Sequence, residues 1–268
     1  MNIDDIKTIA VIGAGDMGHG IAEVALIAGY KVFLRDINQE FVNRGVGRIN
    51  ASLEKLVTKG KVPADHFEKI KTELMVPCTD LAEAVKEADL VIEAIPELMD
   101  LKKETFKAMD AAAPAHTIFA SNTSTMKITD IASATNRPEK VLGLHYFNPA
   151  VIMKLVEVIK GEKTDDETMQ IGFDFVLKNK KVPVKVHKDV PGFIVNRVQA
   201  PSGVLLGCIL DKKIAAPEAV DAIFRNMGSP MGPYETMDYT GPVSYTHLTL
   251  PTTLNSCVCG WWGGGWEG

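Results

Sequence analysis

The chain has 268 residues, of which 46% are hydrophobic and 24% are charged, and its formal net charge at pH 7 is -5. This composition is typical of one large or two modest folded domains, and it excludes an intrinsically disordered protein. A negative net charge provides no basic footprint for nucleic acid. We therefore look for partners among small molecules.

No segment predicts a membrane association or export. The longest apolar runs, such as GVLLGCIL at 203–210, are far shorter than the ~18 to 20 residues that span a bilayer. The opening residues MNIDDIKTIAVIG are acidic where a signal peptide is basic. The four cysteines form no common zinc spacing, and no histidine spacing supports a metal site. We expect a reduced, cytoplasmic protein without a metal.

Short runs rich in valine and isoleucine alternate with helical segments over residues 1–186. The expected strands are KTIAVI, KVFLRD, ELMVP, DLVIEAI, TIFAS, VLGLHYF, KLVEVIK and KVPVKV. Strands that are apolar on both faces and alternate with helices predict an α/β fold, in which a doubly wound parallel sheet is covered by helices on both faces. Residues 38–72 have helical periodicity and many charges, which predicts a helical insertion after the second strand.

From about residue 187 the pattern changes to helices alone. Residues 187–242 predict a smaller all-α domain, which is incomplete as it stands. Residues 243–268 have no helical period and hold all three tryptophans beside a glycine cluster. We expect this last stretch to be a disordered or non-native tail.

The first strand leads into the loop VIGAGDMGHGIAEVA. Gly13, Gly15 and Gly18 stand there in the G-x-G-x-x-G spacing, between a strand and a helix. Gly13 allows a tight turn, Gly15 lets a pyrophosphate approach the backbone, and Gly18 lets helix and strand pack closely. This pattern predicts a Rossmann-type dinucleotide site.

The second strand ends at Asp36, at the position where a carboxylate hydrogen-bonds the ribose 2'-hydroxyl of NAD and repels the 2'-phosphate of NADP. Arg35 beside it argues the other way, because an arginine can accept that phosphate. We expect NAD as the cofactor. FAD, or a glycine turn that binds no nucleotide, is the alternative.

Two ionisable residues interrupt apolar runs further along the chain. His145 lies in VLGLHYF and Glu157 in KLVEVIK. Burying either charge without a partner costs on the order of several kcal/mol. Each residue therefore needs a reason to be there.

Seven stretches together resemble the L-3-hydroxyacyl-CoA dehydrogenase family, which includes 3-hydroxybutyryl-CoA dehydrogenases. They are GAGDMGHGIA, IEAIPE, ASNTS, GLHYFNP, KLVEVI, PGFIVNR and MGPYETMDYTG, and the resemblance runs from about residue 5 to 242. The resemblance implies oxidation of the C3 alcohol of an acyl-CoA, with hydride passing to NAD. It also implies that His145 is the base and Glu157 the carboxylate that orients it, which suits histidine chemistry near neutral pH. A buried structural pair without catalysis is the alternative.

The resemblance assigns further residues to the cleft. Ser124 matches a serine that hydrogen-bonds the substrate oxygen, although a serine after a strand is also a common helix cap. Asn196 matches an asparagine that reaches the cleft from the helical domain. Glu97, Lys102 and Asn148 match positions near the nicotinamide side of NAD, where a surface charge or an Asn-Pro turn is the alternative.

Coenzyme A should meet basic residues. The helical insertion offers five lysines in an acidic chain, and the resemblance assigns contacts with CoA to Ser52 and Lys59. A solvated helix face explains the lysines about as well. Related enzymes that act on a free hydroxy acid or sugar acid, and proteins that bind NAD without turnover, stay open as alternatives.

Family members usually continue with further helices after MDYTG, and the chain resembles a truncated member with an unrelated tail. The resemblance implies a homodimer formed largely by those helices. The dimer is therefore doubtful, and we expect a less stable or less active protein than a full-length relative.

Overall fold

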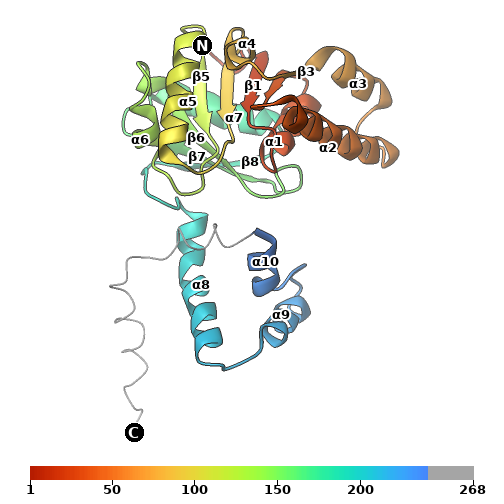
Figure 1. Ribbon diagram of the computed structural model, residues 1–268, viewed down its shortest axis with the longest axis vertical. Coiled ribbons are helices and arrows are strands. Elements are labelled where there is room, and N and C mark those ends of the chain that lie inside the picture. Colours follow the sequence, from red (N-terminus) through yellow and green to blue (C-terminus); the bar gives the residue numbers. More distant parts are fainter. Residues whose placement is uncertain (241–268) are drawn as a thin grey trace. The chain divides into compact units, whose positions relative to one another are not determined.

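The computed structural model describes residues 1–240, which form two compact units (Figure 1). The first unit is Met1–Phe193 and the second begins at Ile194. The predicted tail, 243–268, lies outside the described residues. Each unit is described below by itself.

The first unit is built on an eight-stranded sheet with the order β3-β2-β1-β4-β5-β6-β7-β8. Its strands are β1 (Thr8–Ile12), β2 (Lys31–Arg35), β3 (Met75–Cys78), β4 (Leu90–Glu93), β5 (Ile118–Ser121), β6 (Val141–Tyr146), β7 (Leu155–Lys160) and β8 (Val182–Val186). Every strand that the sequence predicts is present. The strand order reverses between β1 and β4, which is the switch point where doubly wound sheets bind ligands.

The sheet is mixed and not parallel throughout as predicted, because β6 and β7 pair antiparallel. Their connector, residues 147–154, is too short for the crossover of a dozen or more residues that parallel strands require. The antiparallel register places His145 directly opposite Glu157. A mixed sheet therefore brings together the two ionisable residues that interrupt the apolar runs.

Helices cover both faces of the sheet (Figure 1). One core cluster packs residues of α1 (Gly18–Ile27), α2 (Gln39–Thr58) and α7 (Asp166–Lys178) on the sheet, together with α3 (Ala64–Lys69). The other packs α4 (Leu81–Val85), α5 (Met99–Ala112) and α6 (Ile128–Ala132) on the opposite face. Successive residues of β1 belong in turn to one cluster and then to the other, because successive side chains of a strand point to opposite faces of the sheet. The predicted insertion consists of α2, α3 and the π-helix Ile70–Leu74.

The second unit contains α8 (Val195–Asp211), α9 (Pro217–Asn226) and α10 (Pro233–Thr240). Asp221 joins α9 to α10, since its carboxylate accepts hydrogen bonds from the amides of Tyr234 (2.8 Å) and Glu235 (3.2 Å). Arg225 adds an ion pair with Glu235 at 2.5 Å. In the described part of this unit α8 has no fully buried residue.

The segment before α8 belongs to the first unit. The carboxylate of Asp189 accepts hydrogen bonds from the amides of Ile128 and Thr129, at 3.0 and 2.7 Å, and so caps α6 from sixty residues away. Phe193 is buried in the second core cluster. The contacts therefore divide the chain at Phe193, whereas the composition changes at about residue 187.

Candidate active site

The glycine turn after β1 has the geometry that its spacing predicts. Gly13 has φ +104°, and a Cβ there would lie 2.5 Å from the carbonyl oxygen of Ala94. A Cβ at Gly18 would lie 1.7 Å from the carbonyl oxygen of Gly13, so only glycine lets α1 approach the turn. Gly15 is exposed and faces open space. That opening at the N-terminus of a helix fits the pyrophosphate of a dinucleotide.

Asp36, which directly follows β2, is hydrogen-bonded to the glycine turn. One of its carboxylate oxygens accepts a hydrogen bond from the amide of Ala14 at 2.7 Å, and the other accepts one from Ile37 at 2.7 Å. The side chain of Arg35 is engaged elsewhere, because its Nε donates to the carbonyl of Thr79 at 2.9 Å. The carboxylate therefore lies beside the glycine turn, at the place where such a group hydrogen-bonds the ribose 2'-hydroxyl of NAD.

His145 and Glu157 form a buried pair across β6 and β7. His145 Nδ1 lies 2.7 Å from Glu157 Oε2, and the two side chains are 4% and 0% exposed. A carboxylate at Nδ1 selects the tautomer whose Nε2 is an acceptor. This arrangement can take up a proton at Nε2 and stabilise the imidazolium that results.

Two aromatic rings pack around the imidazole. The ring of Phe147 is 4.5 Å and that of Phe193 5.7 Å from the His145 ring. Phe193 has φ 47°, a left-handed conformation that a bulky side chain rarely adopts. Such strain is retained where the surrounding structure fixes it, often beside a functional group. Sequence reasoning did not single out Phe193, although it lies within PGFIVNR.

The strand register brings this pair to the edge of the glycine turn. Ile12, Glu93, Ser121 and Gly143 are paired in succession across β1, β4, β5 and β6. The residues that follow them therefore lie along one edge of the sheet. Gly13 and His145 are both on that edge, and a ligand bound at the turn can reach the imidazole side of the sheet.

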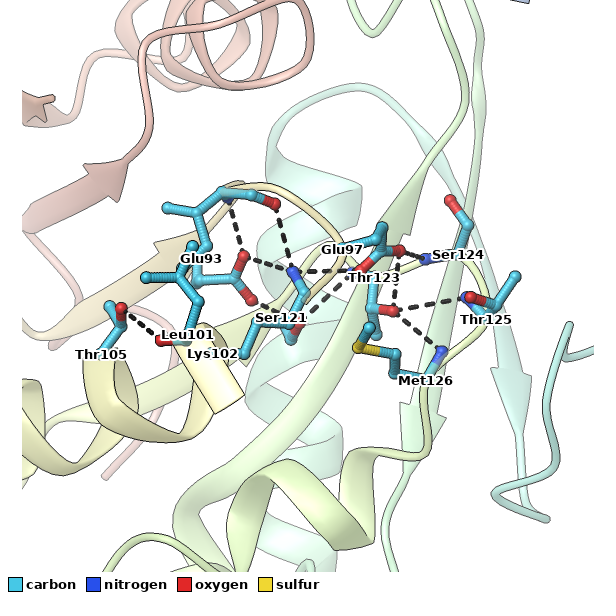
Figure 2. A network of polar contacts seen from close by, with 11 residues as sticks. Glu93, Glu97, Leu101, Lys102, Thr105, Ser121, Thr123, Ser124, Thr125 and Met126 are labelled. Atoms are coloured by element: carbon cyan, nitrogen blue, oxygen red, sulfur yellow. Dashed lines mark hydrogen bonds and ion pairs between the residues drawn. The ribbon is translucent and has the colours of Figure 1, made fainter. Parts of the chain in front are cut away.

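Between them lies a buried polar network (Figure 2). Lys102, only 1% exposed, donates from Nζ to Glu93 Oε1 at 2.6 Å and forms an ion pair with Glu97 Oε2 at 3.2 Å. Glu93 Oε2 accepts a hydrogen bond from Ser121 Oγ at 2.6 Å. Lys102 is therefore no surface charge. Two carboxylates from different segments share it.

Glu97 connects this network to the predicted substrate serine. Its Oε1 accepts hydrogen bonds from Thr123 Oγ1 at 2.9 Å and from the amide of Ser124 at 2.6 Å. The amide groups that begin the next helix bind Asp189, so Ser124 is not the cap of α6. The side chain of Ser124 is half-buried at the carboxyl edge of the sheet.

The two predicted asparagines lie in different units. Asn148 is exposed in the 147–154 connector and precedes Pro149 in a cis peptide bond. Asn196 lies in the first turn of α8, in the second unit. A third asparagine, Asn122, was not predicted. Its Oδ1 accepts a hydrogen bond from the amide of Tyr146 at 2.9 Å and so ties the end of β5 to the end of β6.

Ser52 and Lys59 lie on α2 and at its C-cap. Lys59, Lys55 and Glu54 line a shallow depression in the surface, where cations are exposed to solvent. Ser52 differs, because its hydroxyl donates to the buried Glu23 of α1 at 2.6 Å. Burial raises the pKa of Glu23 to about 7.

Among residues 1–240 no helix is long and apolar enough to cross a membrane. Within the same described residues no group of three or more histidine, cysteine, aspartate or glutamate side chains is placed to hold a metal ion.

A Rossmann-type sheet with a glycine turn, an acidic residue at the end of β2 and a histidine-carboxylate pair at the same edge defines a class of protein, the nicotinamide-dependent oxidoreductases. Comparison with known proteins narrows this class. The NAD-binding domain of 3-hydroxyacyl-CoA dehydrogenase matches residues 8–190, and the C-terminal domain of the same enzymes matches residues 192–249.

Individual relatives agree with the family models. The chain is 41% identical over 239 residues to a probable 3-hydroxybutyryl-CoA dehydrogenase of Bacillus subtilis, covering 88% of this chain and 82% of that protein. It is 44% identical over 238 residues to 3-hydroxyadipyl-CoA dehydrogenase of Escherichia coli. That match covers 88% of this chain but only 50% of the relative. The crystal structure of (S)-3-hydroxybutyryl-CoA dehydrogenase from Ralstonia eutropha has a TM-score of 0.83 at 34% identity, over 91% of this chain and 85% of that one.

The chain belongs to the 3-hydroxyacyl-CoA dehydrogenase family. The predicted family, the α/β fold with a following helical domain, the class of oxidoreductase and NAD as cofactor are thereby confirmed. The chain spans about half the length of the E. coli relative.

Proposed function

We propose that this protein catalyses the NAD-dependent oxidation of a short-chain L-3-hydroxyacyl-CoA, such as 3-hydroxybutyryl-CoA, to the 3-oxoacyl-CoA. The observation that carries the proposal is the buried contact of 2.7 Å between His145 Nδ1 and Glu157 Oε2 at the edge of the glycine turn. When bound, NAD supplies the hydride acceptor.

The residues of the chain have distinct parts in this reaction. His145 accepts the proton of the C3 hydroxyl at Nε2, and Glu157 stabilises the imidazolium. Ser124 hydrogen-bonds the oxygen at C3, and the family resemblance alone assigns Asn196 to the substrate. Gly13, Gly15, Gly18 and Asp36 bind the adenosine and pyrophosphate side of NAD, whereas Glu97, Lys102 and Asn148 serve the nicotinamide side.

Coenzyme A binds along α2 in this proposal. Lys59 is exposed beside Lys55, and this local positive charge suits the phosphates of CoA in a chain that is otherwise acidic. Ser52 contacts CoA only if its hydroxyl leaves Glu23 or accepts a hydrogen bond while it donates to that carboxylate. A cytoplasmic location stays a prediction from the sequence, to be tested by cell fractionation. Light scattering tests the homodimer, which the resemblance implies for the family and which is doubtful for this chain.

The experiment that tests this proposal measures the rate of NADH oxidation with three substrates: acetoacetyl-CoA, free acetoacetate and a keto sugar acid. We expect turnover with acetoacetyl-CoA alone, and a loss of at least about 1,000-fold in kcat for His145→Gln, which removes the base. His116→Gln is the matched control, because His116 is exposed at an Asp89 contact. Turnover with the free acids would indicate a hydroxy-acid enzyme instead. Binding of NADH without any turnover would contradict the proposal.

A further inference from the structure

Glu93 is a buried carboxylate to which none of the predicted roles applies. It ends β4 and is 0% exposed. Its Oε1 accepts hydrogen bonds from Lys102 Nζ at 2.6 Å and from the amide of Ile95 at 2.8 Å, and its Oε2 accepts one from Ser121 Oγ at 2.6 Å. Three donors fully satisfy a charge that would otherwise be costly to bury.

The positive partner of Glu93 is shared with the cleft. Lys102 Nζ lies 2.6 Å from Glu93 and 3.2 Å from Glu97, and it also donates to the carbonyl of Ile95 at 3.3 Å. The shorter contact belongs to the more deeply buried carboxylate. Glu93 therefore holds the ammonium on the sheet side, and Glu97 is left to share its other oxygen with the turn after β5.

That turn carries the predicted substrate serine. Glu97 Oε1 accepts hydrogen bonds from Thr123 Oγ1 and from the amide of Ser124. Thr123 Oγ1 in turn accepts the amide of Met126 at 3.0 Å, which closes the turn. Figure 2 shows the continuous series of contacts from Glu93 through Lys102 and Glu97 to Ser124.

We propose that Glu93 is a positioning residue for Ser124: it fixes Lys102, Lys102 fixes Glu97, and Glu97 fixes the backbone of the turn that carries the serine. The proposal deepens the proposed function and rests on it for the role of the serine hydroxyl. A misplacement of about 1 Å, caused by a change away from the reacting atoms, can slow a reaction by about 100-fold. Glu93 touches neither substrate nor cofactor in this proposal, so its effect is indirect.

The variant Glu93→Gln keeps the shape of the side chain and removes its charge. Lys102 is then left with Glu97 as its one carboxylate, and we expect Glu97 to turn toward it and to release the amide of Ser124. The expected kinetic result is a fall of about 10- to 100-fold in kcat with acetoacetyl-CoA and NADH, while KM for acetoacetyl-CoA changes by less than about threefold.

The chain offers a matched control on α5, the helix that carries Lys102, near its C-terminal end. Asp110 of α5 is also buried, and it forms an ion pair with Arg137 at 2.5 Å and hydrogen bonds with Asn136. Asp110→Asn should lower the melting temperature by a similar amount and leave kcat within about threefold of the wild type. A purely structural Glu93 would behave like this control.

A second readout does not depend on turnover. The amide proton of Ser124 donates to a carboxylate at 2.6 Å, so its NMR signal should lie downfield in the wild type and move upfield in Glu93→Gln but not in Asp110→Asn. Ser121→Ala, which removes one donor to Glu93 and keeps all charges, should move it less in the same direction. It serves in place of Glu93→Gln if that variant does not fold.

The outcomes separate the two proposals. If the wild type turns over no substrate but the Ser124 signal moves as expected, the proposed function fails and the positioning role stands. If the wild type is active and the Ser124 signal and kcat are unchanged in Glu93→Gln, the positioning role is overturned. An equal loss of kcat in Asp110→Asn overturns it as well.

Discussion

Two buried glutamates of the first unit have different surroundings. Glu93, at the carboxyl edge of the sheet, has three donors on its two oxygens. Glu23, in the helix layer, has one donor, Ser52 Oγ, and in the described structure its Oε2 is buried without a hydrogen-bond partner. Burial raises the pKa of Glu23 to about 7. The comparison teaches that the cost of burying a carboxylate depends on its hydrogen-bond partners as well as on its depth.

The largest effect is expected at Glu157, a third buried glutamate, whose carboxylate is paired with His145. Glu157→Gln keeps a hydrogen-bond acceptor near His145 Nδ1 but removes the charge that stabilises the imidazolium. We expect kcat with acetoacetyl-CoA and NADH to fall by about 100- to 10,000-fold, with the protein still folded. Steady-state kinetics measure this loss.

Glu162→Gln is the control for that variant, because Glu162 follows the same strand and is exposed. It should keep kcat within about twofold of the wild type. A Glu157→Gln enzyme that retains a tenth or more of wild-type kcat would show that the pair is only structural.

A buried cation provides the next test. Lys181 is 8% exposed, and its Nζ donates to three carbonyls of the connector between β6 and β7, those of Ala150 (2.6 Å), Val151 (3.0 Å) and Met153 (2.8 Å). Lys181→Met keeps the length of the side chain but leaves these carbonyls unpaired. We expect a loss of about 3 kcal/mol in the free energy of unfolding, measured by urea denaturation.

The same connector carries Asn148, so the affinity for NADH should also fall in Lys181→Met. Lys180→Met changes the exposed neighbouring lysine and should alter the free energy of unfolding by less than about 0.5 kcal/mol. Equal stability of the two variants would mean that Lys181 does not hold the connector.

Much of the fold could be predicted because most of its strands are buried on both faces. Six of the eight, β1, β2 and β4 to β7, are buried on both faces and stand out as continuous apolar runs, whereas β3 and β8 are partly exposed. The direction of β7 was missed because strand direction depends on the length of the connector, which the apolar pattern does not register. The start of α8 at Val195 depends on the left-handed residues Gly192 and Phe193 and on the distant contact of Asp189 with α6.

The site was predicted unevenly for the same physical reason. An ionisable residue inside an apolar strand pointed to His145 and Glu157, and the same signal is present in DLVIEAI, where it would have pointed to Glu93. Lys102 and Ser121 gave no such signal, because a lysine on a helix and a serine at the end of a strand are ordinary on a surface. Only the pairing of Glu93 with Ser121 across β4 and β5 shows that both are buried together.

The smallest expected effect concerns Glu23, the buried glutamate that has a single hydrogen-bond donor. The pKa of Glu23 is raised from its ordinary value of 4.5 to about 7, so the folded protein holds this proton more tightly than the unfolded chain does. The stability that protonated Glu23 contributes is fully present below about pH 4.5 and is lost as the pH rises through about 7. Glu23→Gln cannot ionise, and relative to the wild type it should gain about 1 to 2 kcal/mol in the free energy of unfolding between pH 5 and pH 8.

Urea denaturation at pH 5, 6, 7 and 8 measures this difference. Glu54→Gln, an exposed glutamate on α2, should show a difference from the wild type that stays flat with pH. If Glu23→Gln is equally flat, Glu23 is ionised at little cost and its second oxygen is satisfied in solution. The contrast with Glu93 would then be one of hydrogen-bond geometry alone.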